Sequence, residues 1–270
     1  MTVEQKQKSD ANGASRLLGV WRAVNVPLAA ILLALLLGGL ILWSSGANPF
    51  AAYAALYRGA FSDTEAFGRT LEKATPLILG GLAVAFAFKA GLFNIGGQGQ
   101  LLFGAILAGY IGYRFTGLPF IIHMPLALLV GSLAGAAYAA IAGALRTYTG
   151  AHEVITTIML NFVAINATDY LADGPWKDEG IIARTPAIAE NAAIPVWGNI
   201  PVGFFIAALV AVLIYFLLFR TTIGYEIRTV GLNANAAQYA GMRVSFIIIL
   251  TMGISGMLAG MGGAIETLGV

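Results

Sequence analysis

Amide side chains and glycines are concentrated in one short stretch of this sequence, KAGLFNIGGQGQ, which runs from residue 89 to residue 100. Apolar segments precede and follow it, so we expect its polar backbone at membrane depth. Unpaired peptide groups are too costly in hydrocarbon for a loop that faces lipid, and such a break lies inside protein or lines a water-filled path. The amides of Asn94, Gln98 and Gln100 are neutral groups that can both donate and accept hydrogen bonds.

A second polar set lies on the apolar segment 154–171. Glu153, Thr157, Asn161 and Thr168 share a narrow sector if successive residues advance about 100° around an α-helix. Asn161 lies deep in the apolar stretch, where an amide must pair with another helix or line a cavity. We predict a solute path lined by four amides, each of which could instead satisfy backbone groups of the broken helix: Asn94, Gln98, Gln100 and Asn161.

His152 and Glu153 stand together at the start of this segment, which raises the question of proton chemistry. A carboxylate at a helix N-terminus also interacts favourably with the macrodipole, and a histidine at a cytoplasmic helix end is more often solvated. We expect these local roles for both residues.

Two common energy sources for transport, a nucleotide site and a proton relay, have no motif in this sequence. A P-loop requires a lysine between glycine and serine or threonine, and none of the five lysines follows a glycine. The apolar segments also lack the central Asp, Glu and His chain of a proton relay. Cysteine is absent, which excludes disulfides and thiolate metal sites. We predict no catalytic residue, metal or cofactor on this chain, and we expect energy to come from another subunit.

Composition identifies a membrane protein: 59% of the 270 residues are hydrophobic and 10% are charged. The net charge of +2 gives little support for nucleic-acid binding. A spanning helix needs ~20 mostly apolar residues. We therefore predict an all-α, polytopic transmembrane helix bundle in the lipid bilayer, with about seven spans at residues 26–43, 74–88, 101–115, 119–145, 154–171, 202–219 and 244–265.

The basic residues indicate the topology. With the N-terminus inside, nine Lys and Arg lie in cytoplasmic segments and six lie outside. This orientation divides the chain into a cytoplasmic tail at 1–25 and a transmembrane domain at 26–270. The domain then carries an external loop at 172–200 and a cytoplasmic loop at 220–243, which contains helix-forming patches broken by glycine.

Small residues recur every four positions on two of the predicted spans. Such ridges allow helix backbones to approach closely, and we expect them to pack the bundle. They comprise Gly131, Gly135, Ala139 and Gly143 on one span and Gly256, Gly260 and Ala264 on the other.

Three ordered motifs together resemble a known family. They are GGLAVAFAFKAGLFNIGGQGQLLFGAILAGY, AHEVITTIMLNFVA and GLNANAAQYAGMRVSFIIILTMGISGMLAGMGGAIETLG. The pattern is similar to the permease subunits of ABC importers for nucleosides and simple sugars, and more distantly to branched-chain amino-acid and ribose permeases. The resemblance extends from about residue 70 to the end of the chain.

The resemblance implies a type II ABC importer in the cell membrane. Its partners are a second permease subunit, the same or homologous, two ABC ATP-binding subunits that hold ATP and Mg, and an external solute-binding protein. It also implies that the segment GLNANAAQYAGM is a coupling segment, whose short helix sits in a cleft of the ATPase. The matching positions are Gly231, Asn233, Ala236, Ala237, Tyr239 and Gly241.

Two features depart from the family pattern. Many relatives carry glutamate where Gln98 stands, and family members are usually longer than 270 residues, so we expect one or more C-terminal helices to be missing. We predict a permease subunit that works by alternating access. The alternative is a secondary transporter or channel for a small polar solute, because both can use broken helices.

Overall fold

The structure is a computed structural model that describes residues 25–269. Most of these residues are helical, and the chain divides after Ser62 into two compact units. The N-terminal unit contains the helix Asn25–Ser44 and α2, Pro49–Phe61, which are tied by a 2.6 Å hydrogen bond from the Tyr53 hydroxyl to the Leu35 carbonyl. The cytoplasmic tail predicted for residues 1–25 lies, up to residue 24, outside the described residues.

The C-terminal unit is a bundle of long helices. Within this bundle, α10 packs against α3, α4 and α5. Of the described helices that could span a membrane, α10 has the largest share of buried residues. The long helices are α3, Thr64–Lys89; α4, Gly97–Arg114; α5, Phe120–Thr149; α6, Glu153–Asp173; α7, Val202–Arg220; and α10, Val244–Leu268.

Six described helices are long and apolar enough to cross a membrane, and they confirm a polytopic membrane bundle. The predicted count of about seven is not confirmed. All seven predicted segments are helical, but α4, with 18 residues, is less apolar than the six helices that could span a membrane. The reason is its composition, because Gln98 and Gln100 in its first turn and Arg114 in its last turn lower its apolarity.

The predicted glycine ridges pack the bundle, as expected, and the structure shows that their partners are each other. A Cβ atom on Gly135 would lie 2.3 Å from the Gly256 carbonyl oxygen and 2.7 Å from Cα of Gly260. One on Gly131 would lie 2.8 Å from Cβ of Ala264. Because only a hydrogen atom fits at these points, α5 and α10 touch backbone to backbone. This contact forms the centre of the bundle.

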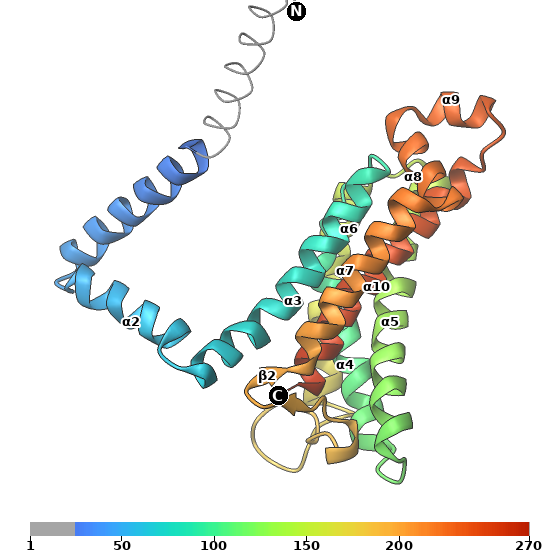
Figure 1. Cartoon of the computed structure of the whole chain (residues 1–270). Coiled ribbons are helices and arrows are strands. Elements are labelled where there is room, and N and C mark those ends of the chain that lie inside the picture. The colour runs from blue at the N-terminus through green and yellow to red at the C-terminus, as the bar shows by residue number, and fades with distance from the viewer. Residues whose placement is uncertain (1–24, 270) are drawn as a thin grey trace, which may run out of the picture. The chain divides into compact units, whose positions relative to one another are not determined.

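The two ends of the C-terminal unit differ (Figure 1). One end carries α8, Thr222–Leu232, and α9, Ala234–Tyr239, which form the helical patches expected in the 220–243 loop. They are separated at Asn233 rather than at a glycine. The other end carries the α6–α7 connection, with the 3-10 helix η1, Glu190–Ala192, and a small hairpin of β1, Val196–Trp197, and β2, Ile200–Pro201.

Candidate functional site

The glycine-amide stretch breaks the helical path, as the sequence predicts. α3 ends at Lys89, residues 90–96 are not helical, and α4 begins at Gly97. Gly91 has φ +68°, in the left-handed region that favours glycine. The break reaches into the core, since Asn94 and Gln100 each expose only 2% of their surface.

Two of the four predicted amides bind each other. Asn94 Nδ2 donates to Gln100 Oε1 and Gln100 Nε2 donates to Asn94 Oδ1, both at 2.9 Å. Asn94 Oδ1 also accepts from the amide of Gly96 at 3.0 Å, and Asn94 Nδ2 donates to Ser255 Oγ at 2.7 Å. Ser255 then donates to the carbonyl of Ala83 at 2.7 Å. This network joins the break to α3, α4 and α10.

The third amide, Asn161 on α6, binds the break from the other side. Its Oδ1 accepts from the backbone amide of Gly99 at 2.8 Å, and its Nδ2 donates to the carbonyl of Ile95 at 2.9 Å. The first amides of an α-helix have no partner within the helix. Asn161 therefore supplies an acceptor at the start of α4 and a donor for the loop that precedes it.

Gln98 differs from the other three. It is exposed in the first turn of α4, and its side chain forms no hydrogen bond with any residue between 25 and 269. Asn94, Gln100 and Asn161 thus satisfy polar groups of the break, whereas the amide of Gln98 satisfies none of them. Whether these residues line a solute path stays a prediction.

An ion pair that the sequence analysis missed lies beside the break. Glu153, 3% exposed, pairs with Arg146 at the end of α5, and its Oε1 accepts from the backbone amide of Phe93 at 3.4 Å. The side chain of His152 is 66% exposed, as expected for a solvated histidine. Arg146 lies seven positions before Glu153, and the helix α5 ends between them, at Gly150. A basic residue at this spacing is the signal that could have identified the pair.

Residues of the predicted coupling segment have mixed roles. Asn233 caps α9, its Oδ1 accepting from the amide of Ala236 at 3.0 Å, and Gly241 with φ +83° follows the helix end. Ala237 is fully buried within the core, whereas Ala236 is exposed and Tyr239 is 95% exposed. The coupling role stays a prediction, and α9 presents a mostly exposed surface for it.

The break and the 220–243 loop meet through two glycines. A Cβ atom on Gly231 would lie 2.3 Å from the carbonyl oxygen of Lys89 and 2.8 Å from the carbonyl carbon of Ala90. One on Gly91 would lie 3.2 Å from the Gly231 carbonyl oxygen. The end of α8 is therefore in backbone contact with the start of the break, which joins the two predicted functional segments directly.

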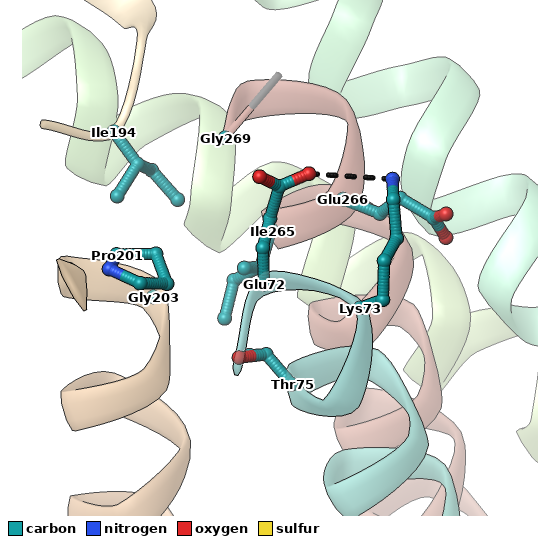
Figure 2. A pocket seen from close by; sticks show the side chains of 9 residues that line it. All are labelled: Glu72, Lys73, Thr75, Ile194, Pro201, Gly203, Ile265, Glu266 and Gly269. Atoms are coloured by element: carbon teal, nitrogen blue, oxygen red, sulfur yellow. Dashed lines mark ion pairs between the residues drawn. The ribbon is translucent and has the colours of Figure 1, made fainter. Parts of the chain in front are cut away.

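A small cavity lies at the opposite end of the bundle, between α3, α7 and α10 (Figure 2). Its volume is about 10 Å³, roughly the space that one water molecule requires. Glu72 and Lys73, whose charged groups lie 3.3 Å apart, are at its rim. No organic solute fits there in this conformation. Among the described residues, no group of three His, Asp or Glu is arranged to hold a metal ion.

Comparison with known proteins identifies relatives over nearly the whole chain. Residues 67–270 match the family described as branched-chain amino acid transport system / permease component. The guanosine ABC transporter permease protein NupP of Bacillus subtilis is 42% identical over 252 residues, which cover 90% of this chain and 72% of NupP.

Two further relatives are named for different solutes, a nucleoside and a sugar. The nucleoside ABC transporter permease protein NupB of Lactococcus lactis is 35% identical, with 92% of this chain and 71% of NupB covered. The glucose ABC transporter permease protein TsgB13 of Haloferax volcanii is 32% identical, with 94% of this chain and 70% of TsgB13 covered. No solved structure was found to match this chain.

Proposed function

Since the chain belongs to the family of ABC transporter permease components, as the resemblance of its motifs indicated, we propose that it forms the membrane path of an ATP-driven nucleoside importer. The family membership makes it a membrane transport subunit and not an enzyme. The observation that carries the choice of solute is the 42% identity to a guanosine permease across 90% of this chain.

The subunits proposed around it follow from the same family. A second permease subunit completes the path, two ATP-binding subunits hold ATP and Mg, and a solute-binding protein delivers the solute outside the cell. The relatives support a pair of different permeases, because NupQ of Bacillus subtilis, a second guanosine permease protein, is 31% identical over 73% of this chain.

The proposed orientation places α8 and α9 in the cytoplasm and the hairpin end outside. The nine-to-six division of basic residues supports it. Single cysteines at Asn191 and Asn233 test it with an impermeant thiol reagent in intact cells. Labelling at position 191 and not at 233 is expected, and the reverse pattern would overturn the orientation.

The proposed mechanism is alternating access driven from α9. Its exposed face, which includes Ala236 and Tyr239, docks on an ATP-binding subunit and moves when that subunit closes. The contact between Gly231 and the backbone at Lys89 passes this displacement to the break, and α4 carries Gln98 with it. In this scheme Gln98 bonds the solute, while the other three amides satisfy the polar groups of the break in the resting arrangement.

Reconstitution provides the test of function. Proteoliposomes that contain the permease pair, the ATP-binding subunits and the binding protein should accumulate labelled guanosine when Mg-ATP is enclosed. Uptake that continues without ATP and stops with an ionophore would identify a secondary transporter instead. Passive, bidirectional flux that needs neither would identify a channel.

The similarity to a glucose permease supports one other solute class. Simple sugars share hydroxyl groups with the ribose of a nucleoside but lack its base. Excess unlabelled glucose should leave guanosine uptake unchanged if the proposed nucleoside specificity is correct. Uptake of glucose, with no uptake of guanosine, would assign the chain to the sugar importers.

A further inference from the structure

Two cations stand at one aromatic ring near the end of the bundle that carries α8. The ammonium group of Lys89, the last residue of α3, lies 5.9 Å from the ring centre of Phe219 on α7. The guanidinium of Arg228 on α8 lies 5.2 Å from the same ring. Arg220 follows Phe219 in the chain and is exposed. We call Lys89, Phe219, Arg220 and Arg228 the basic-aromatic patch.

The patch has no acidic partner among residues 25–269. None of its three cations forms an ion pair there, and Glu226, two positions before Arg228, pairs with none of them either. Arg228 uses its Nε to bind the carbonyl of Gly224 at 3.3 Å, which leaves both of its Nη groups available. Like charges held together without a counter-charge repel each other, so an external anion stabilises this arrangement.

The ring of the patch belongs to the exposed face of α7. The buried residues of α7 form one stripe, Gly203, Ala207, Ile214 and Leu218. The other faces carry large exposed apolar side chains, among them Tyr215 and Phe216, and the Tyr215 ring lies 5.0 Å from that of Phe219. A membrane helix with such a face contacts lipid chains, and aromatic residues near its end mark the interface with the head groups.

We propose that the basic-aromatic patch binds the head-group phosphate of an anionic phospholipid whose acyl chains lie along α7. Lys89 and Arg228 both donate to the phosphate, and Arg220 adds charge at the interface. Basic side chains between membrane helices bind anionic head groups in this way. The bound lipid connects α3, α7 and α8, and so it holds the segment on which the proposed coupling depends.

Lipid binding to the purified permease tests the proposal. Wild-type protein in detergent is titrated with phosphatidylglycerol and with phosphatidylcholine, and the lipid retained is counted by native mass spectrometry. Each basic residue near an anionic membrane contributes roughly fivefold to binding. Lys89→Gln combined with Arg228→Gln should therefore weaken phosphatidylglycerol binding about 25-fold and leave the weak phosphatidylcholine binding unchanged. Phe219→Leu, which keeps both cations, should reduce binding less.

Controls separate the patch from general surface charge and from other anions. Arg243→Gln removes a cation outside the patch and should not change binding. Competition by inorganic phosphate at low concentration would identify a soluble anion as the ligand and overturn the proposal. Equal phosphatidylglycerol binding by the wild type and the double variant would also overturn it. Loss of ATP-binding subunits by the double variant, with lipid binding intact, would assign the patch to a protein partner instead.

Discussion

Two glutamines lie in the first turn of α4, and replacing each of them by leucine tests two different roles. Gln100 is buried and exchanges two 2.9 Å hydrogen bonds with Asn94, whereas Gln98 is exposed and bonds to no described side chain. Leucine has nearly the volume of glutamine, so the replacement removes the amide and leaves little cavity. Gln100→Leu should therefore destabilise the permease, and Gln98→Leu should not.

The loss of stability expected for Gln100→Leu follows from the hydrogen bonds that Asn94 keeps and those that it loses. In Gln100→Leu it still donates to Ser255 Oγ and accepts from the amide of Gly96, but one N–H and one acceptor position become buried without a partner. Such groups cost about 1–3 kcal/mol. A loss of about 2 kcal/mol lowers the Tm of a domain of about 150–250 residues by about 4–8 °C. An exposed substitution such as Gln98→Leu changes stability by no more than about 0.5 kcal/mol.

The assay compares Tm and guanosine uptake for the two variants. Thermal unfolding is followed in one detergent, and uptake is measured in proteoliposomes with equal amounts of permease. Gln98→Leu should keep the wild-type Tm and lose about threefold to tenfold in uptake, the value of one hydrogen bond. Equal Tm values for both variants would refute the stabilising role of the Asn94–Gln100 pair. Normal uptake by Gln98→Leu would remove Gln98 from the proposed path.

Three further substitutions test packing and coupling. Gly135→Ala places a methyl group 2.3 Å from a backbone oxygen and should cost about 1–3 kcal/mol in thermal unfolding. Gly80→Ala is the control, because beyond its own stretch of helix no atom lies within 4 Å of the new methyl group, and it should be neutral or stabilising. Equal Tm values for the two variants would contradict the close contact of α5 and α10. Gly231→Ala should separate α8 from the break, so that ATP hydrolysis continues while the amount of guanosine transported per ATP falls. An unchanged amount of guanosine per ATP would show that this contact does not couple α8 to the break. Ala236→Glu changes an exposed residue of α9 and should reduce copurification of the ATP-binding subunits at an unchanged Tm. Ala237→Glu should instead lower the Tm, because it buries a charge. Full copurification with Ala236→Glu would exclude this face of α9 as the docking surface.

The helices and the break could be predicted because their signals are local. Long apolar runs predict spanning helices, and all seven predicted segments are helical. The concentration of glycine and amide residues at 89–100 predicts a non-helical interruption, which the structure has at residues 90–96. Helix α2 was not predicted, although Asn48 followed by Pro49 is a typical helix start.

Contacts between distant segments could not be predicted in the same way. A buried amide must find a partner, but the sequence does not state which one, and Asn94 finds Ser255, 161 positions away. Ala237 matches a family position that implies docking on the ATPase, yet its small side chain is buried inside this chain, in a core that α3, α5, α7, α8 and α10 share. A pattern of small residues predicts close packing without indicating the partner.

The bonds around the break determine what a movement of α8 can do. Asn161 fixes the break to α6, Asn94 fixes it to α10, and the contact between Gly91 and Gly231 fixes it to α8. Packed interfaces change between discrete arrangements rather than deforming gradually. A displacement of α8 must therefore either carry the break and α4 with it or separate the two glycines. Only the first outcome moves Gln98, so alternating access through this route requires that the glycine contact persist while the bonds from Asn161 or Asn94 rearrange.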